Sequence, residues 1–454
     1  MNQLKRFMLK FWGTYFILLL LVSGCGGLNM EKHYQKMRGQ MVARDYDDAS
    51  KYLDKVKQDF YGEKNRLLFY MDKGMVLHLA GKYKESNQFL EKAKTTAQDL
   101  WTESVGSNAA AWITTDNALP YQGEDFEKVF IHFVAALNFI DLADYDAARV
   151  EARQITNKLE LYNSKYTDKS GKNAYKDDAF SRWLSGKLAE TEGSAGYNDA
   201  WIDYKKALDV YRSDYVTRYG TPVPRFLVGD ALRALTKLGP EFSQELATVK
   251  AKYPNVSVPD DKGMGEVILL HLSGEAPYKI DKFWDAKAGN KPIRIAYPEF
   301  VPKPFHIASV RVISNNNQGT SELAENVTAI AKQNLNDHMA RIKAKAIARA
   351  IAKAIAAATA DAAGKNMGNK KAGAALQLAS AIFSVASAVN EQADKRSWIT
   401  LPAAINVARI MLPAGDHELQ LEFLASNGNV IERGTVKAKA VAGRPTFVSY
   451  RTYR

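Results

Sequence analysis

Residues 144–148 read Asp-Tyr-Asp-Ala-Ala, and four stretches in the first half of the chain share this pattern of a tight turn, a tyrosine and a small residue three positions later. A small or aliphatic residue often follows ten positions after the tyrosine. Because three and ten residues are about one and three helical turns, these side chains share one helix face, where a small residue lets a neighbouring helix approach. The pattern predicts pairs of antiparallel helices. In the four stretches, the tyrosine and the small residue three positions later are Tyr46 and Ala49, Tyr83 and Ser86, Tyr145 and Ala148, and Tyr197 and Ala200.

This pattern resembles the tetratricopeptide repeat (TPR), a 34-residue helix-turn-helix unit. The tyrosines lie 37, 62 and 52 residues apart, so insertions interrupt the repeat, notably at 101–125 and 162–178. An α-solenoid without repeat homology is the alternative interpretation. Both interpretations predict a helical repeat domain over residues 25–250 with a continuous core, and such stacks usually present a concave surface to another polypeptide.

Past Lys252 the signals change from helix to strand. Residues 251–263 contain Tyr-Pro-Asn-Val-Ser-Val-Pro-Asp-Asp, which cannot lie inside a helix and predicts a linker. Short apolar runs follow, residues 418–423 alternate polar with apolar side chains, and Asn427-Gly428 is typical of a two-residue hairpin turn. We therefore expect a small antiparallel β-sandwich from residues 264–320 and 393–454. The whole chain is predicted to be an α+β multidomain protein.

An alanine-rich insert, residues 321–392, interrupts this β region and is expected to form a helical hairpin. Glu322 and Glu325 suit a helix N-terminus, and residues 372–390 are uncharged but too rich in alanine and serine to favour a membrane span. Basic residues and isoleucines each recur every four positions, which predicts a basic amphipathic helix. Three interpretations stay open: packing on itself or on the protein, self-association, and membrane contact. The candidate membrane or partner face comprises Arg341, Lys345, Ile347, Arg349, Ile351, Lys353 and Ile355.

The first 25 residues have the layout of a secretory signal: three basic residues, an uncharged and mostly apolar stretch at 11–22, and Val22-Ser-Gly-Cys25. The apolar core of about 12 residues is shorter than the ~20 that a spanning helix needs. Cys25 is the only cysteine, so an intrachain disulfide is excluded. The alternative interpretation is an ordinary buried cysteine behind a plain signal or anchor helix.

This stretch resembles the lipobox of bacterial lipoproteins. The resemblance implies cleavage after Gly24, removal of residues 1–24, and acylation of Cys25 with fatty acid such as palmitate. Because Gly26 rather than aspartate follows the cysteine, the resemblance also implies an outer-membrane location facing the periplasm.

The sequence offers few candidates for chemistry. No two of the seven histidines lie within four residues, so the HExxH zinc arrangement is absent, and Gly-x-Ser-x-Gly is absent as well. Ser170-Gly-Lys172 and Ser185-Gly-Lys187 lack the glycine spacing of a phosphate loop. The net charge of +12 is interpreted mainly as a solvated surface, and the basic stripe at 341–353 has no interleaved aromatic residues for binding bases. We predict no catalytic residue, no metal ligand, no cofactor and no nucleic-acid partner.

The chain resembles a poorly characterised family of proteobacterial envelope lipoproteins with tetratricopeptide-like repeats and a C-terminal β region. The resemblance implies a non-enzymatic outer-membrane lipoprotein that acts as a periplasm-facing scaffold or adaptor for an unidentified protein, in envelope, cell-wall or surface-polymer assembly. A self-assembling structural subunit is one alternative, and homo-oligomers are possible. An enzyme acting on cell-wall polymer is another, supported by clustered aromatic residues. The resemblance rests on residues 22–25, 121–127, 198–207, 396–402 and 412–415.

Overall fold

The computed structural model describes residues 26–106, 117, 119–165, 174–258, 263–288, 291–365 and 392–453. It contains both helices and strands, so the α+β class expected from the sequence is confirmed. The chain divides into two compact units, Met1–Glu63 and Lys64–Arg454, which are described separately.

The described part of Met1–Glu63 is a helix pair closed by aromatic side chains. Helices α2 (Gly26–Val42) and α3 (Tyr46–Val56) are followed by the π-helical turn η2 (Lys57–Tyr61). The ring of His33 stacks on Phe60 with centroids 4.7 Å apart, and its Nε2 lies 3.0 Å from the Tyr61 hydroxyl. Burial lowers the pKa of His33 to about 4, so the ring is neutral at physiological pH and hydrogen-bonds as an uncharged group.

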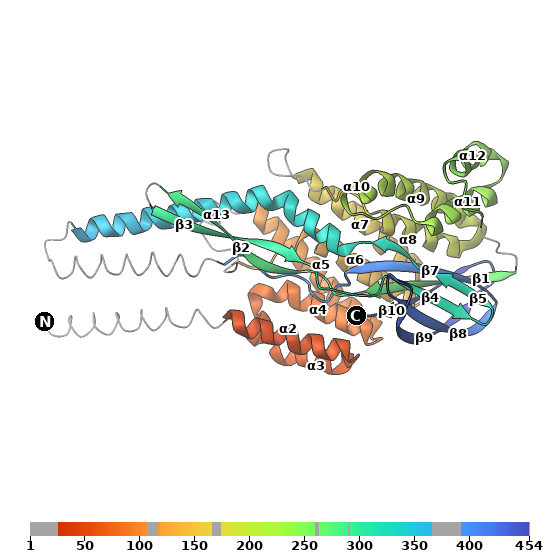
Figure 1. Ribbon diagram of the computed structural model, residues 1–454, viewed down its shortest axis with the longest axis horizontal. Coiled ribbons are helices and arrows are strands. Elements are labelled where there is room, and N and C mark those ends of the chain that lie inside the picture. The colour runs from red at the N-terminus through yellow and green to blue at the C-terminus, as the bar shows by residue number, and fades with distance from the viewer. Residues whose placement is uncertain are drawn as a thin grey trace. The chain divides into compact units, whose positions relative to one another are not determined.

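The second unit begins with an array of paired helices (Figure 1). Helix α4 packs against α5, α6 against α7, α8 against α9, and α11 against α12, while α5 contacts α6, α7 contacts α8 and α9 contacts α11. Each pair therefore contacts the next. The helices are α4 (Arg66–Leu79), α5 (Tyr83–Gly106), α6 (Asp125–Asp141), α7 (Tyr145–Lys165), α8 (Ala179–Ala189), α9 (Tyr197–Val210), α10 (Val216–Arg218), α11 (Arg225–Leu238) and α12 (Ser243–Lys252), with short turns η3 (Glu63–Asn65), η6 (Glu190–Gly196), η7 (Tyr211–Tyr215) and η8 (Pro240–Phe242).

Helix α6 shows how local sequence and packing combine in this array. Gly123 takes a positive φ of 72° immediately before the helix, and Glu124 and Glu127 form a capping box that satisfies backbone N–H groups of the first turn. Phe126, Phe130 and Phe133 follow at helical spacing, and all three are buried. The helix is thus started by its caps and held by an aromatic face in the core.

The strands of the second unit form two four-stranded sheets and one two-stranded ribbon. The sheet orders are β10-β1-β7-β6 and β5-β4-β8-β9, and β2 pairs with β3. The strands are β1 (Met264–Ser273), β2 (Tyr278–Ala288), β3 (Lys291–Val301), β4 (Ser309–Ser314), β5 (Asn317–Thr320), β6 (Glu322–Glu325), β7 (Ala404–Pro413), β8 (Gly415–Leu424), β9 (Val430–Ala440) and β10 (Pro445–Arg451).

One strand pair differs from the antiparallel arrangement that we expected. Strands β1 and β10 pair in parallel, with Glu266 opposite Pro445 and Leu272 opposite Arg451, while the other described pairs are antiparallel. A parallel pair needs a long crossover connection, and here most of the strand region of the chain separates the two strands. Hydrophobic alternation cannot distinguish the two directions.

One hydrophobic core cluster draws buried side chains from both four-stranded sheets, including Val267 and Ile410 of one sheet and Val310, Leu421 and Ala438 of the other. The alternation expected for residues 418–423 is confirmed, since the apolar residues of β8 point into this core. The expected hairpin also forms, but its loop spans 425–429 with Gly428 at a φ of 83°, and is therefore longer than the two-residue turn predicted.

The start of the alanine-rich insert is a strand, which corrects the expected helix start at Glu322 and Glu325. These residues form β6, which pairs with β7, and helix α13 (Val327–Lys365) begins after them. Asn326 caps α13, because its Oδ1 accepts a hydrogen bond from the backbone N–H of Ala329 at 3.0 Å. The rest of the expected hairpin, residues 366–391, lies outside the described residues.

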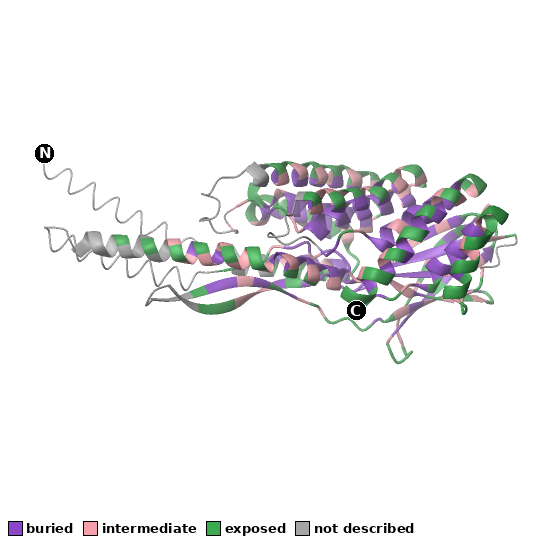
Figure 2. Cartoon of the chain, turned by 90° about the horizontal axis from the view of Figure 1, so that it is seen from above, coloured by how far each residue is buried: buried purple, intermediate pink, exposed green. Residues whose placement is uncertain are grey.

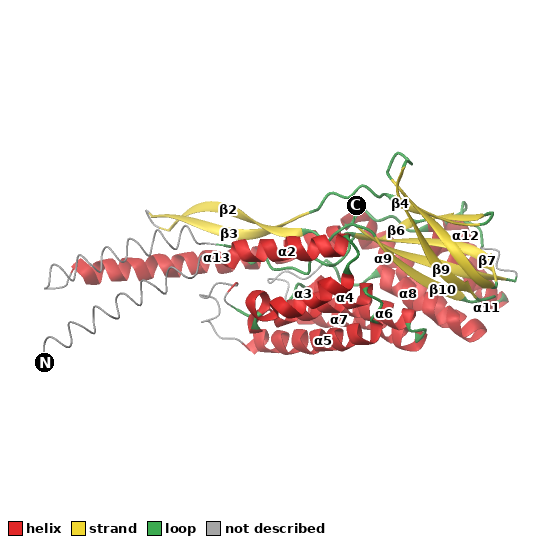
Figure 3. Cartoon of the chain, turned by 90° about the horizontal axis from the view of Figure 1, so that it is seen from below, coloured by secondary structure: helices red, strands yellow, loops and turns green. Residues whose placement is uncertain are grey.

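Helix α13 runs beside the β2–β3 ribbon. The two elements contact each other, and Lys343 Nζ lies 4.5 Å from the centre of the Tyr297 ring. Figures 2 and 3 show this helix and ribbon extending past the neighbouring helices of the second unit. Figure 2 also shows many exposed residues along both.

Candidate functional site

A network of six charged side chains lies where helices α8 and α11 meet strands β1 and β7. Three cations and three carboxylates meet in it, and five of the six residues are at most 3% exposed. Buried charges are stable only when they are paired and hydrogen-bonded, and equal numbers of each sign meet that condition here. The members are Lys187, Glu190, Asp230, Arg233, Glu266 and Arg409.

Two of the cations bridge all three carboxylates. Lys187 Nζ lies 3.0 Å from both Glu190 and Asp230 and 2.6 Å from Glu266. Arg233 Nη2 lies 2.8 Å from each of the same three carboxylates. Each carboxylate therefore meets at least two cations, and the helices are tied to the strands through them.

The protonation states follow from this pairing. Burial opposes ionisation of Glu266, but Arg233, Lys187 and Arg409 outweigh it and hold the pKa of the carboxyl below its usual value. Burial and Arg233 oppose the charge on Lys187, but the three carboxylates outweigh them and raise its pKa. Glu266 and Lys187 are therefore ionised at neutral pH. A carboxylate clamped in this way is a poor general base, because its lone pairs are already engaged.

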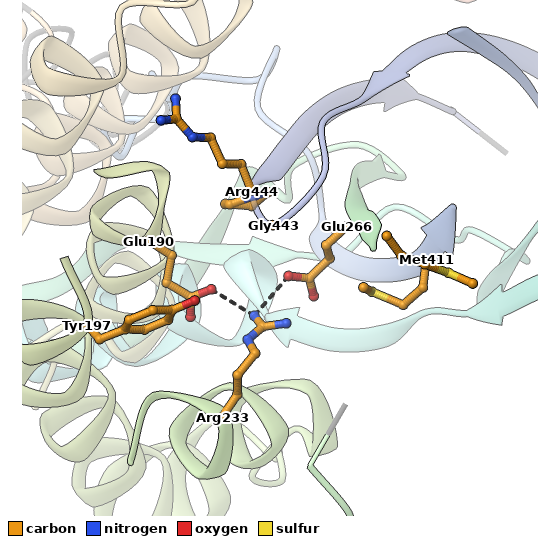
Figure 4. Close-up of a pocket in the computed structure, with 9 residues that line it drawn as sticks. Glu190, Tyr197, Arg233, Glu266, Met411, Gly443 and Arg444 are labelled. Atoms are coloured by element: carbon orange, nitrogen blue, oxygen red, sulfur yellow. Dashed lines mark hydrogen bonds and ion pairs between the residues drawn. The ribbon is translucent and has the colours of Figure 1, made fainter. Parts of the chain in front are cut away.

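A small hollow borders the network (Figure 4). It is lined by residues of η6, α9, α11, β1, β7 and the β9–β10 loop, and Arg233 lies between Glu190 and Glu266 at its wall. Its volume of about 240 Å³ includes space open to solvent, whereas pockets for small molecules usually measure ~300–1,000 Å³. The lining residues are Glu190, Tyr197, Arg233, Met264, Glu266, Met411, Gly443, Arg444 and Pro445.

A second buried group, centred on Glu127, joins two of the stretches singled out in the sequence, 121–127 and 396–402. The Glu127 carboxylate accepts hydrogen bonds from the Trp398 backbone N–H at 2.7 Å, from the Tyr121 hydroxyl at 2.5 Å and from the Glu124 N–H at 3.0 Å. Burial, with the nearby charge of Glu124, raises the pKa of Glu127 to about 7. Residues far apart in sequence are thus held at the N-terminus of α6.

Arg396 and Thr400 fix the same segment to the helices. Arg396 places its guanidinium 5.1 Å from the centre of the Tyr121 ring and donates to Asn65 Oδ1 at 2.9 Å. Thr400 donates to Asp72 Oδ1 at 3.0 Å. Both stretches therefore have a structural role, namely docking the segment before β7 onto α4 and α6.

A third buried group combines tyrosines with two carboxyl groups between η7 and β6. Tyr215 donates to both oxygens of Glu325 at 3.1 and 3.0 Å, and Tyr211 donates to the Ala324 carbonyl at 2.7 Å. Tyr175 hydrogen-bonds Asp178. Burial raises the pKa of both carboxyls, and that of Glu325 is held well above its usual value. The protonated state of Glu325 is therefore favoured, and its contacts attach β6 to the helices.

The tyrosines of the repeated pattern occupy one position in the fold. Each is the first residue of its helix, α3, α5, α7 or α9, and each is half-buried. Ala49, Ser86, Ala148 and Ala200 are 0% exposed.

The helices come close at two of these small residues. A Cβ placed on Gly74 would lie 2.5 Å from the Leu90 side chain, and one on Gly186 would lie 2.7 Å from the Tyr204 ring and 3.0 Å from the Ala200 carbonyl oxygen. Ser86 Oγ donates to the Gly74 carbonyl at 2.7 Å.

The structure describes some of the other predicted site residues. Cys25 and Gly24 lie outside the described residues. On α13, Arg341, Ile351 and Ile355 are exposed and Lys345 and Ile347 are half-buried, but Arg349 is buried. The side chain of Lys353 is not among those that the structure describes. The basic stripe therefore does not lie wholly in solvent.

The aromatic clusters that suggested an enzyme acting on cell-wall polymer comprise Trp101, Trp112 and Tyr121, and Trp183, Tyr197, Trp201 and Tyr204. Trp112 lies outside the described residues, and Tyr197 is half-buried. Tyr121, Trp183, Trp201 and Tyr204 are all buried, and Trp183 donates its ring N–H to Asp230 at 2.8 Å. Trp101 packs edge-on against Tyr162 with ring centroids 5.4 Å apart. In these positions the rings fill the core.

Comparison with known proteins gives no relative. No protein-family model matches the chain, and no match was found among curated proteins or solved structures. Within the described ranges, no helix has the length and apolar character needed to cross a membrane. The same part of the chain contains no group of three or more His, Cys, Asp or Glu residues suited to hold a metal ion.

Proposed function

We propose that the chain is an outer-membrane lipoprotein, acylated at Cys25 and facing the periplasm, that binds another envelope protein through its helix pairs. It acts without turnover, as a scaffold or adaptor in envelope, cell-wall or surface-polymer assembly. The observation that carries the proposal is the array in which α4–α5, α6–α7, α8–α9 and α11–α12 contact one another in order. Such arrays bury a continuous core and offer one long surface to a polypeptide.

The helix pairs support a TPR-like solenoid with insertions as the finer architecture. Tyr83, Tyr145 and Tyr197 each begin the second helix of a pair. Gly74 and Gly186 approach the facing helix beside Ser86 and Ala200, which are small residues of the pattern. These features favour a repeated unit over an irregular helical bundle.

The strand region supports a β-sandwich as its finer architecture. Its core draws on both four-stranded sheets, which is the layering of a sandwich. The strand region proposed at 264–320 and 393–454 also takes in β6 (Glu322–Glu325), so the insert proposed at 321–392 begins after this strand. Most of the helical region proposed at 25–250 belongs to the same compact unit as the strands, Lys64–Arg454. The Lys187–Arg233 network and the Glu127 group join the helices to the strands, which suits a scaffold that holds one shape.

Site-specific photocrosslinking in whole cells tests the proposal. A photoreactive amino acid is placed at Val150 of α7 or Ile202 of α9, which are exposed aliphatic positions on the helix pairs. The expected result is an adduct of one defined mass at a helix position. The matched control is Val441, which is exposed beyond β9 in the strand region, and it should give no such adduct. The absence of any adduct from the helix positions, or the same adducts from all three positions, contradicts the proposal.

A further inference from the structure

Helix α13 and the β2–β3 ribbon together form a projecting element, here named the cationic arm and defined as residues 278–288, 291–301 and 327–365. Contacts between α13 and β3 hold the two parts side by side, and both extend past the neighbouring helices (Figures 1 and 2). The two parts are therefore neighbours in space although they are separated in sequence.

The arm concentrates the positive charge of the chain. Its residues include twelve lysines and arginines against five aspartates and glutamates, a net charge of +7 out of the +12 of the whole sequence. The fold therefore gathers more than half of the net charge on one element. Such a charge asymmetry favours an anionic surface as partner.

Exposed apolar side chains accompany this charge. Phe283 and Trp284 of β2 are 49% and 48% exposed, and Ile351 and Ile355 of α13 are 43% and 61% exposed. Consecutive strand residues point to opposite faces, so each face of the ribbon carries an aromatic ring. Ile351 and Ile355 are four residues apart and share one helix face.

The ribbon also places cations beside its aromatic rings. The Arg294 guanidinium lies 5.1 Å from the centre of the Phe283 ring and pairs with Asp285 at 2.9 Å. Lys282, two positions before Trp284, is on the same face of the strand as that ring. Aromatic rings combined with lysine and arginine are typical of protein surfaces that lie in the headgroup region of a bilayer.

We propose that the cationic arm docks onto an anionic lipid surface, with Phe283 and Trp284 entering the headgroup region and the exposed basic side chains facing the lipid charges. A second copy of the chain is a less favourable partner for the arm, because two arms of net charge +7 repel each other. The proposal does not rest on acylation of Cys25, and it holds or fails separately from the scaffold function.

The single cysteine makes a direct test possible. In the full chain carrying Cys25→Ser, an environment-sensitive fluorophore is attached to Ile355→Cys on the arm or, as matched control, to Val150→Cys on α7. Both are exposed aliphatic positions on helices. Vesicles of phosphatidylcholine alone or with about 30% phosphatidylglycerol are added at roughly 0.1 M salt, where screening is moderate.

The arm probe is expected to shift to the blue only with the anionic vesicles, and the control probe is expected to stay unchanged. The N-terminal segment is the same in both proteins, so any binding of that segment to vesicles is common to both. High salt is expected to reverse the shift, since electrostatic attraction is screened. An equal shift with neutral vesicles, or a shift that grows with protein concentration in the absence of vesicles, overturns the proposal, the latter in favour of self-association.

Charge variants test the residues themselves. Arg341→Glu combined with Lys345→Glu is expected to reduce partitioning onto anionic vesicles at least tenfold, because each basic residue near such a surface contributes a several-fold gain. Phe283→Ser with Trp284→Ser should also weaken binding. The matched control, Lys84→Glu with Lys206→Glu, makes the same charge change at exposed positions of α5 and α9. Equal losses in the control and arm variants, with unchanged thermal unfolding in both, overturn the proposal.

Discussion

Replacing Glu266 by glutamine removes one negative charge from the buried network while keeping the size of the side chain. Lys187 Nζ and Arg233 Nη2 lie 2.6 and 2.8 Å from this carboxylate, and Arg409 Nη1 lies 3.4 Å from it. The variant leaves three cations with two carboxylates in the interior. Removing one partner of a buried ion pair typically costs ~3–5 kcal/mol, because the remaining charge is uncompensated. We expect Glu266→Gln to lower the free energy of unfolding by about that amount.

Urea unfolding of the full chain, followed by circular dichroism, measures this change. The matched control is Asp285→Asn, which makes the same change at a carboxylate that pairs with Arg294 but is exposed to solvent. An exposed pair contributes little to stability, because water and salt screen it. A loss for Glu266→Gln as small as that of the control would refute the view that the network fastens the helices to the strands.

The remaining predictions concern a titrating group, a helix contact and the acyl anchor. Because burial raises the pKa of Glu127 to about 7, the folded state holds a proton that the unfolded state releases near pH 4.5, so this group contributes less stability as pH rises from about 4.5 to 7. Glu127→Gln should flatten that part of the pH–stability curve by about 3 kcal/mol. Urea unfolding at several pH values measures the change. An unchanged slope would contradict a raised pKa of Glu127 in the folded state. Gly186→Ala forces a Cβ to within 2.7 Å of Tyr204 and should lower the free energy of unfolding by ~1–3 kcal/mol. The control Gly39→Ala in α2, where a Cβ would meet nothing within 4 Å, should be neutral or slightly stabilising. Thermal unfolding compares the two variants, and equal effects would argue against a tight α8–α9 crossing. Cys25→Ser should abolish incorporation of labelled palmitate.

Features set by local sequence could be predicted. The turns before Tyr83, Tyr145 and Tyr197 and the alternation of residues 418–423 depend on neighbours a few positions away, and both correspond to elements of the structure. Glu322 and Glu325 show the limit of such reasoning. Acidic residues before an alanine-rich helix favour a helix start, but pairing with β7, which is distant in sequence, makes this segment a strand.

The buried groups could not be predicted, because their members come from distant parts of the chain. Lys187 belongs to a Ser-Gly-Lys stretch without distinctive spacing, and its partners Glu190, Asp230 and Glu266 lie on three other elements or turns. Glu127 was part of a stretch singled out by resemblance, yet nothing in the sequence pairs it with Trp398. Only the tertiary fold brings these charges together and shifts their pKa values.

Palmitate labelling with fractionation of cells that express the wild-type chain or Cys25→Ser tests the proposed acyl anchor. The wild type is expected to incorporate labelled palmitate and to sediment with the outer membrane. The serine variant should take up no label and should leave that fraction. A wild-type chain without label, or a serine variant that fractionates as the wild type does, would contradict the proposed anchor.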